Sequence, residues 1–365
     1  MKRLLCVLSN MNTGGAETFL MKLYRRLDRT KYQMDFCLNT SDECFYNKEI
    51  RELGGRIFCV PPKSENSKEF KKQLAELVKK ENYKYVLRVT SNAAGFMDLK
   101  IAKKAGAEIC SARSSNSSDG TSLVTKVVHR IGRMLWEKYV DVKFAPSDLA
   151  AAYTFGKKAV KCGEVAPLHN AVDLNIYKYY PEERERLREA FGLQDKLVVG
   201  HIGRFMEQKN HAFLLDVFYE IKKQKDNAML LLVGGNGNLE QAVHQKVTDL
   251  GLEDSVVFAG IRSDIPQLLS AMDVFVMPSF FEGMPNTVIE AQATGLPCVI
   301  ADTITHEANI TGLVAYLPLE EPQTWATHAL EAVREQRPDP RQIFLDKKYD
   351  IESTVQDFVK LVFGE

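Results

Sequence analysis

The sequence lacks several features that define whole classes of protein. Its 365 residues contain no apolar run long enough to span a bilayer, and the short run at residues 3–8 has no small-residue cleavage site after it. The seven cysteines are scattered and without any C-x-x-C spacing, which favours reduced thiols over a disulfide framework or a zinc site. No low-complexity segment stands out. These absences leave a globular protein that is large enough for two domains.

The net formal charge of zero conceals two halves of opposite charge. Residues 1–170 contain 30 Lys and Arg against 18 Asp and Glu, so the remainder contains 48 − 30 = 18 against 48 − 18 = 30. Such a split either draws two domains together across a cleft or directs the basic half toward an anionic surface. Lipid headgroups and a pyrophosphate-bearing acceptor are both surfaces of that kind.

Short apolar segments alternate with amphipathic segments along both halves. We expect strands at residues 3–9, 33–39, 56–60, 83–89, 107–112, 196–204, 228–235, 255–260, 273–279, 297–302 and 313–318. Helical patterns between them predict parallel sheets covered on both faces. The fold class is therefore α/β, with two doubly wound Rossmann-like domains at residues 1–170 and 171–345. A C-terminal helix at 346–365 is expected to pack back on the first domain. Since ligands bind beyond the carboxyl ends of parallel strands, the active site is expected in the interdomain cleft.

Two glycines follow the first expected strand. Gly14 and Gly15 lie in "SNMNTGGAETFL", directly before an expected helix. Glycine lets backbone N–H groups approach an anion at the positive end of a helix, and a plain tight turn is the alternative. The spacing is not G-x-G-x-x-G, so the dinucleotide fingerprint is absent.

A basic pair follows the strand that opens the second half. Arg204 and Lys209 lie five residues apart in "GRFMEQKNH", before a helix that is expected near His211. A guanidinium and an ammonium at one strand end suit the two phosphates of a diphosphate, and solvated surface cations are the alternative. His211, like His169 in the expected hinge at 167–175, is interpreted as a structural contact or a helix cap.

Two glutamates lie on either side of a helix start in "SFFEGMPNTVIEAQATGLPCVIAD", residues 279–302. The amides of Asn286 and Thr287 at that start suit a phosphate. A carboxylate can accept hydrogen bonds from adjacent hydroxyls, so Glu290 suits a ribose diol and Glu282 a sugar. The alternative is that both acids only stabilise the helix N-terminus. Glu290 fits that alternative poorly because its neighbours are apolar.

Four motifs in this order resemble the retaining glycosyltransferases of family 4, which have the GT-B fold, and most resemble the bacterial branch that builds capsular and exopolysaccharides. The motifs are "MNTGGAETFL", "HNAVDLNIY", "GRFMEQKNH" and "FEGMPNTVIEAQATGLPCV", and the resemblance spans essentially the whole chain. It implies two domains facing across a cleft. It also implies retaining transfer of a sugar from a nucleotide diphosphate sugar, with a UDP-sugar expected before a GDP-sugar, to a growing lipid-linked polysaccharide.

The resemblance gives each motif residue a role. Arg204, Lys209 and Glu282 are the implied catalytic residues: the two cations would neutralise the departing diphosphate, and the carboxylate would hold the donor sugar. The implied donor-binding residues are Gly14, Gly15, Gly260, Ile261, Arg262, Gly283, Met284, Pro285, Asn286, Thr287 and Glu290. No metal and no other cofactor is expected, and the sequence contains no D-x-D.

One segment departs from the family pattern. Relatives often carry a "HSHNSS"-like run where this chain has "SARSSNSSDG", so Arg113 and Ser115 stand in place of histidines. We name no catalytic base, because the leaving phosphate can itself take the acceptor's proton. Arg113 and Asn116 are the predicted acceptor-side residues, and Arg113 suits a phosphate or an anionic acceptor.

Residues 122–144 combine apolar and basic side chains at helical spacing. They predict either a basic amphipathic helix that contacts anionic lipid or an ordinary domain helix with a solvated charged face. The expected partners are a nucleotide-sugar donor and a glycan or glycolipid acceptor, without nucleic acid. The expected location is the cytoplasm. With the lipid contact formed, the protein is expected at the inner face of the cell membrane. Rival functions are a nucleotide-sugar epimerase, a phosphorylase and a non-catalytic GT-B partner domain, and the intact donor motifs argue against the last.

Overall fold

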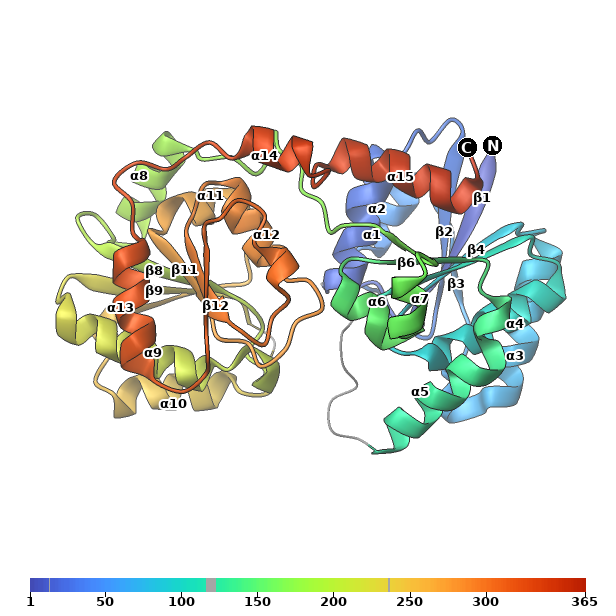
Figure 1. Ribbon diagram of the computed structural model, residues 1–365, viewed down its shortest axis with the longest axis horizontal. Helices are drawn as coiled ribbons and strands as arrows, with labels where there is room; N and C mark the ends of the chain where they lie inside the picture. The colour runs from blue at the N-terminus through green and yellow to red at the C-terminus, as the bar shows by residue number, and fades with distance from the viewer. Residues whose placement is uncertain (13, 116–122, 236) are drawn as a thin grey trace. The chain divides into compact units, whose positions relative to one another are not determined.

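The computed structural model describes residues 1–12, 14–115, 123–235 and 237–365. The chain separates into two compact units (Figure 1). Unit 1 comprises Met1–Ala171 and Ile351–Glu365, and unit 2 comprises Val172–Asp350. The end of the chain therefore belongs to the unit that its beginning builds.

Unit 1 is built on a seven-stranded parallel sheet in the order β3-β2-β1-β4-β5-β6-β7. Its strands are β1 (Lys2–Val7), β2 (Tyr32–Leu38), β3 (Ile57–Cys59), β4 (Tyr85–Thr90), β5 (Ile109–Ser114), β6 (Val142–Ala145) and β7 (Val165–Pro167). Its helices are α1 (Gly15–Arg26), α2 (Asn47–Glu52), α3 (Lys63–Lys80), α4 (Phe96–Ala105), α5 (Leu123–Trp136), α6 (Asp148–Phe155), α7 (Lys157–Lys161) and α15 (Ile351–Phe363). Strand β1 lies between β2 and β4, so the winding reverses there, and such a switch point is where ligands bind to sheets of this kind.

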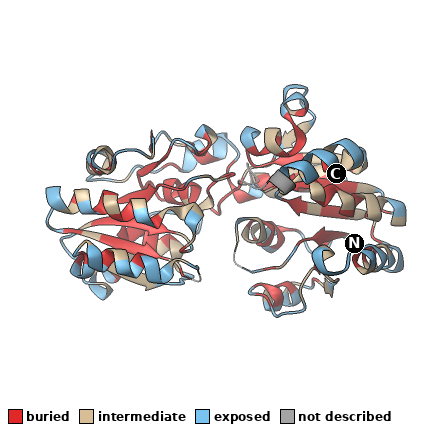
Figure 2. Ribbon diagram, turned by 90° about the horizontal axis from the view of Figure 1, so that it is seen from below, coloured by how far each residue is buried: buried red, intermediate tan, exposed pale blue. Residues whose placement is uncertain are grey.

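Each face of this sheet carries its own apolar core. Leu4 and Cys6 of β1 belong to one core and Leu5 and Val7 to the other, as the two-residue period of a strand requires. Helix α15 covers the first core, where Phe358 is fully buried. In both units the strands are buried while the outer faces of the helices are exposed (Figure 2).

The sequence pattern does not predict two strands of unit 1, β6 and β7. These strands are only four and three residues long, too short for an alternating pattern to stand out. Strand β7 lies at the edge of the sheet and ends at Pro167. Because proline has no backbone N–H, it is tolerated there, where no hydrogen bond to a neighbouring strand is lost. The amphipathic pattern at 122–144 is likewise divided, since α5 ends at Trp136 and β6 follows.

Unit 2 is built on a six-stranded parallel sheet in the order β10-β9-β8-β11-β12-β13. Its strands are β8 (Leu197–Ile202), β9 (Ala228–Val233), β10 (Val256–Gly260), β11 (Val274–Met277), β12 (Cys298–Ala301) and β13 (Val314–Leu317). Its helices are α8 (Pro181–Ala190), α9 (His211–Gln224), α10 (Glu240–Asp249), α11 (Ile265–Ala271), α12 (Asn286–Ala293), α13 (Pro322–Ala332) and α14 (Arg341–Asp346). All six strands lie within or overlap the segments predicted from sequence.

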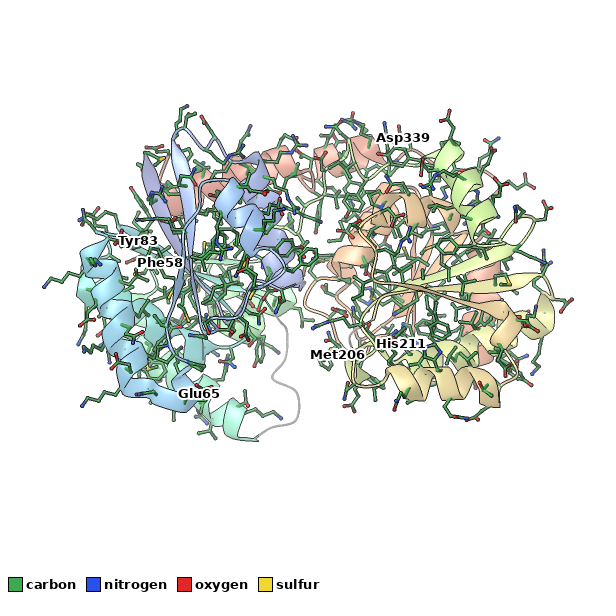
Figure 3. All side chains as sticks on the ribbon, turned by 180° about the vertical axis from the view of Figure 1, so that it is seen from behind. Phe58, Glu65, Tyr83, Met206, His211 and Asp339 are labelled. Carbon is green, nitrogen blue, oxygen red and sulfur yellow. The ribbon has the colours of Figure 1, made fainter. Side chains whose placement is uncertain are left out.

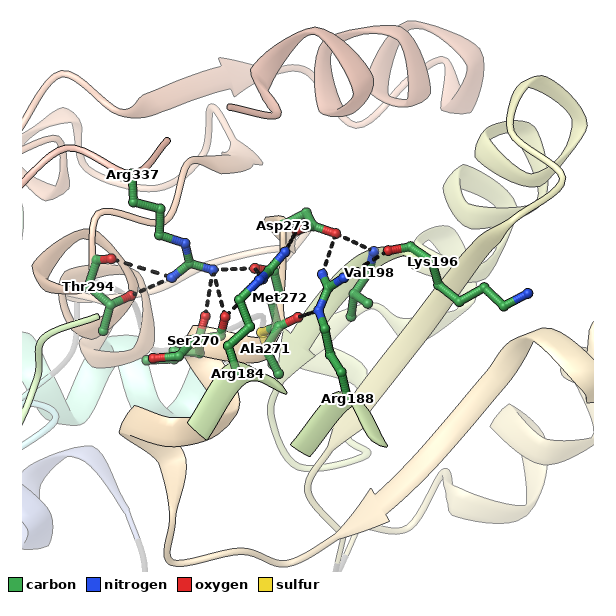
Figure 4. A network of polar contacts seen from close by, with 11 residues as sticks. Arg184, Arg188, Lys196, Val198, Ser270, Ala271, Met272, Asp273, Thr294 and Arg337 are labelled. Atoms are coloured by element: carbon green, nitrogen blue, oxygen red, sulfur yellow. Dashed lines mark hydrogen bonds and ion pairs between the residues drawn. The ribbon is translucent and has the colours of Figure 1, made fainter. Parts of the chain in front are cut away.

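Three arginines form a network of hydrogen bonds and ion pairs at the edge of unit 2 where the strands begin (Figure 4). Asp273 precedes β11, pairs with Arg184 and Arg188, and accepts a hydrogen bond from the Val198 N–H at 2.7 Å. Arg337 donates to carbonyl oxygens in and just after the last turn of α11, including that of Leu269 at 3.0 Å. Cations stabilise the unpaired carbonyls of a helix C-terminus. This network fixes α8, β8, α11 and β11 at the edge opposite the carboxyl ends of the strands.

Each helix in the described part of the chain is too short or too polar to span a bilayer.

Candidate active site

Two loops of unit 2 are tied together where β8 and β11 end. Residues 203–210 follow β8, residues 278–285 follow β11, and the two strands are neighbours in the sheet. Gln208 joins the loops: its carbonyl oxygen accepts from the Phe280 N–H at 2.9 Å, and its side-chain amide donates to the Phe281 carbonyl oxygen at 2.9 Å. Both loops therefore lie at the carboxyl edge, with their spacing fixed by hydrogen bonds.

The same loops bring Lys209 and Glu282 into an ion pair. The Lys209 Nζ lies 2.7 Å from the Glu282 Oε1, and the two side chains are 19% and 12% exposed. Lys209 ends a short 3₁₀ turn, and Asn210 in the left-handed conformation (φ 51°) redirects the chain into α9. Two residues that are 73 positions apart in sequence are thus adjacent at the site.

Arg204 lies in the first of these loops with an exposed side chain. The preceding Gly203 N–H donates to the Val233 carbonyl oxygen at 2.9 Å, which anchors the start of the loop to β9. Met206 and His211 mark the middle of the loop and the first residue of α9 (Figure 3). Arg204 is therefore a cation held on the surface at the same edge as Lys209.

Helix α12 begins at the second loop and carries the other glutamate. It runs from Asn286 to Ala293, and Gly295 after it adopts a positive φ of 71°. Glu290 lies one turn into the helix with only 5% of its surface exposed. Of the predicted donor-binding residues beside it, Gly283, Met284 and Pro285 are buried, and Asn286 and Thr287 are half-buried.

Gly260, Ile261 and Arg262 lie at the carboxyl end of β10. The Gly234 N–H donates to the Gly260 carbonyl oxygen at 2.9 Å, which aligns this turn with the end of β9. Ile261 is 60% exposed. The Arg262 guanidinium binds the Asp264 carboxylate through two hydrogen bonds, of 2.8 and 2.6 Å, which lower the pKa of that carboxyl below its usual range. These residues therefore lie along the same sheet edge as the Lys209–Glu282 pair.

In unit 1, Gly14 and Gly15 lie at the start of α1, which follows β1. Gly14 is the N-cap with extended backbone and no side-chain cap. A Cβ placed on Gly14 would lie 2.3 Å from the Glu17 Oε2, so the Glu17 carboxylate lies close over this turn. An anionic group at that position is stabilised by the positive end of the helix dipole.

Arg113 lies on β5 with its side chain buried inside unit 1. Its guanidinium carbon lies 3.7 Å from the centroid of the Phe19 ring, and Nη2 donates to the Asn170 Oδ1 at 2.5 Å. Burial lowers the pKa of Arg113 to about 9. Its acceptor-side role stays a prediction, and Asn116, the other predicted acceptor-side residue, lies outside the described residues.

The described part of the chain contains no group of three or more His, Cys, Asp or Glu side chains arranged to hold a metal ion. The expectation that catalysis needs no metal stays a prediction.

Comparison with known proteins now identifies the family. Residues 196–335, which include both loops of the site, match the family model of the glycosyl transferases group 1. Over 344 residues the chain is 35% identical to EpsF of Bacillus subtilis (strain 168), provisionally named a glycosyltransferase, and the match spans 92% of this chain and 89% of EpsF. The chain belongs to the group 1 glycosyltransferases. Its assignment to family 4 and to the retaining class stays a prediction.

Solved structures confirm that this glycosyltransferase has the GT-B fold. Anabaena HepE in complex with UDP superimposes with a TM-score of 0.72 at 20% identity, over 100% of this chain and 96% of HepE. The sucrose-phosphate synthase of Thermosynechococcus elongatus superimposes with a TM-score of 0.79 at 15% identity, over 99% and 98% of the two chains. The prediction of an α/β fold with two doubly wound domains is therefore correct.

Sequence reasoning missed two residues that organise the site of this glycosyltransferase. Gln208 joins the two loops, and nothing in "MEQKNH" distinguishes it from a surface glutamine. Gln292 of α12 is fully buried, and its side chain bonds the carbonyl of Ala308 at 2.7 Å and the N–H of Ile310 at 2.9 Å. A polar residue two positions after Glu290, with apolar Ala291 and Ala293 on either side of it, is the signal that could have found Gln292.

Of the two alternatives for His211, a structural contact or a helix cap, the structure shows the contact. The cap of α9 is Asn210, whose Oδ1 accepts from the Phe213 N–H at 3.4 Å, and not His211. His211 is a buried contact, with its ring centroid 4.8 Å from that of Phe205. Its ring also lies 4.8 Å from that of His201, a fully buried residue of β8.

Proposed function

We propose that this glycosyltransferase moves a hexosyl group from a UDP-sugar to a lipid-linked glycan that grows into a surface polysaccharide, with retention of the anomeric configuration. The observation that carries the proposal is the Lys209–Glu282 pair in the loops at the carboxyl edge of unit 2. It places a cation suited to a diphosphate 2.7 Å from a carboxylate suited to the hydroxyls of the donor sugar. Arg204 adds a second cation in the same loop.

In the proposed step, the bond between the anomeric carbon and the β-phosphate oxygen breaks. A bond to the acceptor hydroxyl oxygen forms on the same face of the sugar, and the acceptor's proton passes to the departing phosphate oxygen. Negative charge develops on the leaving UDP, where fixed cations lower the barrier because they need no reorganisation. Lys209 and Arg204 have this role, and Glu282 orients the sugar. No residue is assigned as a catalytic base, and no metal is invoked.

The donor assignment uses Glu290 together with the printed names of relatives. Glu290 would bind the ribose diol from the first turns of α12, next to the helix N-terminal amides. A relative from Escherichia coli, 30% identical over 142 residues covering 38% of this chain and 37% of that protein, is named a UDP-Gal:alpha-D-GlcNAc-diphosphoundecaprenol alpha-1,3-galactosyltransferase. HepE crystals contain UDP, UDP with glucose, or UDP-glucose. These names support a uridine donor and a lipid-diphosphate acceptor.

The test is thermal stabilisation of the full chain by UDP, GDP, ADP and CDP in the presence of a chelator. We expect UDP to raise the melting temperature most. Glu290→Gln weakens a hydrogen bond to a charged acceptor, which contributes about 1.5–3 kcal/mol, so its affinity for UDP should fall by at least about tenfold. Glu331→Gln, at an exposed position of α13, is the control and should bind UDP normally.

Each outcome of this test bears on a separate part of the proposal. A preference for GDP would mean that the donor carries guanine rather than uracil, and the assignment of the site residues would be unchanged. Normal binding of UDP by Glu290→Gln would remove Glu290 from the ribose contact. Stabilisation that disappears with the chelator would overturn metal independence. The anomeric configuration of the transferred sugar, measured by NMR on the product, decides between retention and inversion.

A further inference from the structure

Around Gly132, helix α5 packs against unit 1 through small and polar residues, and Trp136 at its end packs against an apolar core of that unit. A Cβ placed on Gly132 would lie 2.4 Å from the Ala93 carbonyl oxygen, so the helix backbone lies directly against the turn at Ala93–Gly95. The Ala93 N–H donates to the His129 Nδ1 at 3.1 Å, and the His129 ring stacks on that of Tyr153 at 4.8 Å. Before Trp136, the inward face of α5 thus has little of the apolar character by which helices usually pack.

The outward face of the same helix is apolar. Its exposed side chains are Val127 (57%), Val128 (39%), Ile131 (39%), Met134 (75%) and Leu135 (47%). At 100° per residue these five positions share one side of the helix. They are five of the fifteen large apolar side chains that are exposed among the described residues, although α5 has only 14 residues.

This polarity is the reverse of that of an ordinary domain helix, which buries its apolar stripe and exposes its charges. A contiguous exposed apolar surface marks a contact with another molecule or with a membrane. The helix lies at the outside of unit 1, beside α4 (Figure 1). We therefore infer that another molecule or a membrane covers the apolar face of α5, which consists of Val127, Val128, Ile131, Met134 and Leu135.

The charges around this face favour an anionic occupant. Lys126 and Arg130 are exposed along one border of the apolar face, and Lys138 is exposed just beyond the end of the helix. Residues 123–136 contain no Asp or Glu. Unit 1 as a whole contains 31 Lys and Arg against 21 Asp and Glu, so its net charge is 31 − 21 = +10. A second copy of the chain would bring the same cations toward one another, whereas an anionic bilayer would neutralise them.

We propose that the apolar face of α5 docks on the surface of a bilayer that contains anionic lipid. The helix would lie in the interface plane, with its apolar side chains among the acyl chains and Lys126, Arg130 and Lys138 at the headgroups. Fourteen residues at about 1.5 Å each cannot span a membrane, so the contact is peripheral. The inference extends the proposed function, because it would hold the enzyme at the surface where a lipid-linked acceptor is found.

The test is sedimentation of the full chain with vesicles of phosphatidylglycerol and phosphatidylcholine, and separately with vesicles of phosphatidylcholine alone. No donor or acceptor is present, so the result is independent of the proposed catalytic function. We expect binding to the mixed vesicles and much weaker binding to the zwitterionic ones. Val127→Ser with Met134→Ser should reduce binding to mixed vesicles by about tenfold or more, because insertion of two apolar side chains is lost.

Matched controls separate the α5 surface from general effects. Ile343→Ser with Leu345→Ser removes two exposed apolar side chains from α14 and should bind normally. Lys126→Gln with Arg130→Gln should abolish the preference for phosphatidylglycerol. Lys71→Gln with Lys72→Gln removes the same charge from the exposed face of α3. This variant should keep most of the preference for phosphatidylglycerol.

Three results would overturn the proposal. The first is no binding of the native chain to mixed vesicles, and the second is equal binding by the native chain and the Val127/Met134 variant. The third is a concentration-dependent dimer without lipid that the same variant makes monomeric, which would assign the apolar face to a second copy. All positions changed on α5 are exposed, and unaltered thermal stability of each variant would show that the fold is intact.

Discussion

The Lys209–Glu282 pair makes a direct prediction about turnover. Lys209→Met removes a fixed cation from the departing diphosphate, and loss of one such stabilising group typically costs about 10²–10³ in kcat. Glu282→Gln should also reduce kcat because the sugar loses a charged acceptor. Affinity for the intact UDP-sugar should change much less in both variants, since the effect is greatest in the transition state. Transfer rates and UDP-sugar binding, measured on the same preparations, check this prediction.

A second ion pair in unit 2 supplies the control. Lys246 pairs with Asp216 at 2.7 Å on helices α10 and α9, away from the two loops of the site. Both side chains are half-buried and neither belongs to the loops of the site, so Lys246→Met should leave kcat nearly unchanged. If Lys209→Met turns over as fast as Lys246→Met, Lys209 has no part in the chemical step.

His211 makes a prediction about pH. Burial, followed by the charge of Lys209, lowers the pKa of His211 to about 4, whereas an unfolded histidine titrates near about 6.5. The unfolded chain therefore binds the proton first, and stability is lost as the pH falls from about 6.5 toward 4. Between pH 7 and pH 5 the loss from this ring is about 2 kcal/mol. His211→Phe keeps the aromatic contacts with Phe205 and His201 and should lose correspondingly less stability over that interval.

Denaturant unfolding at both pH values measures this difference. The two tryptophans allow the unfolding of each unit to be followed separately. Trp136 lies in unit 1 and Trp325 in unit 2. In a Trp136→Phe background the buried Trp325 reports unit 2, which contains His211. A His211→Phe variant with the same pH dependence as its parent would contradict the assigned cause.

Individual residues differ in how far the sequence predicts their positions. Glu282 and Lys209 could be predicted as members of one site because each follows a strand, and the carboxyl ends of parallel strands share an edge. Their direct contact could not, because it depends on Gln208 joining the two loops. Arg113 was predicted beside the acceptor, but the sequence does not reveal that Phe19 and Asn170 enclose its guanidinium.

Among the helices, α15 shows why local pattern alone is insufficient. Its amphipathic spacing predicts a helix, but the surface it covers comes from strands near the start of the chain. The Phe363 ring lies 4.7 Å from that of Tyr32 and 5.0 Å from that of Tyr85. Phe358 is fully buried beside Phe144, a residue of the short strand β6 that the sequence does not predict. Such contacts join residues more than 200 positions apart, and no periodicity encodes them.

We therefore predict that α15 is part of the stability of unit 1. Phe358→Ala leaves a cavity in a core that α1, β4 and β6 also line, and such substitutions cost about 3–5 kcal/mol. Gln356→Ala changes an exposed position of the same helix and should have almost no effect. Trp136 fluorescence in a Trp325→Phe background reports unit 1. An unchanged unfolding midpoint in Phe358→Ala would mean that α15 is not part of the cooperative core.

For the chain as a whole, the alternation of strands and helices was sufficient to predict two sheets and their class. The expectation that residues 346–365 pack on the first domain does not follow from this alternation, because such packing depends on which core is left open rather than on chain order. The opposite charges of the halves persist in the two units. Unit 2 contains 48 − 31 = 17 basic and 48 − 21 = 27 acidic residues, so its charge is −10.

In the proposed complex, UDP binds unit 2 against the net charge of that unit, through the local cations Arg204 and Lys209 and the start of α12. Binding to the folded form alone stabilises it by RT ln(1 + [UDP]/Kd), which is about 2.7 kcal/mol at a hundredfold excess over Kd. We expect saturating UDP to raise the unfolding midpoint reported by Trp325 more than that reported by Trp136. Glu290→Gln should reduce the Trp325 shift at the same UDP concentration. A larger shift in the Trp136 signal would place the principal nucleotide contacts in unit 1 and contradict the assignment of Arg204, Lys209 and Glu290 to the donor.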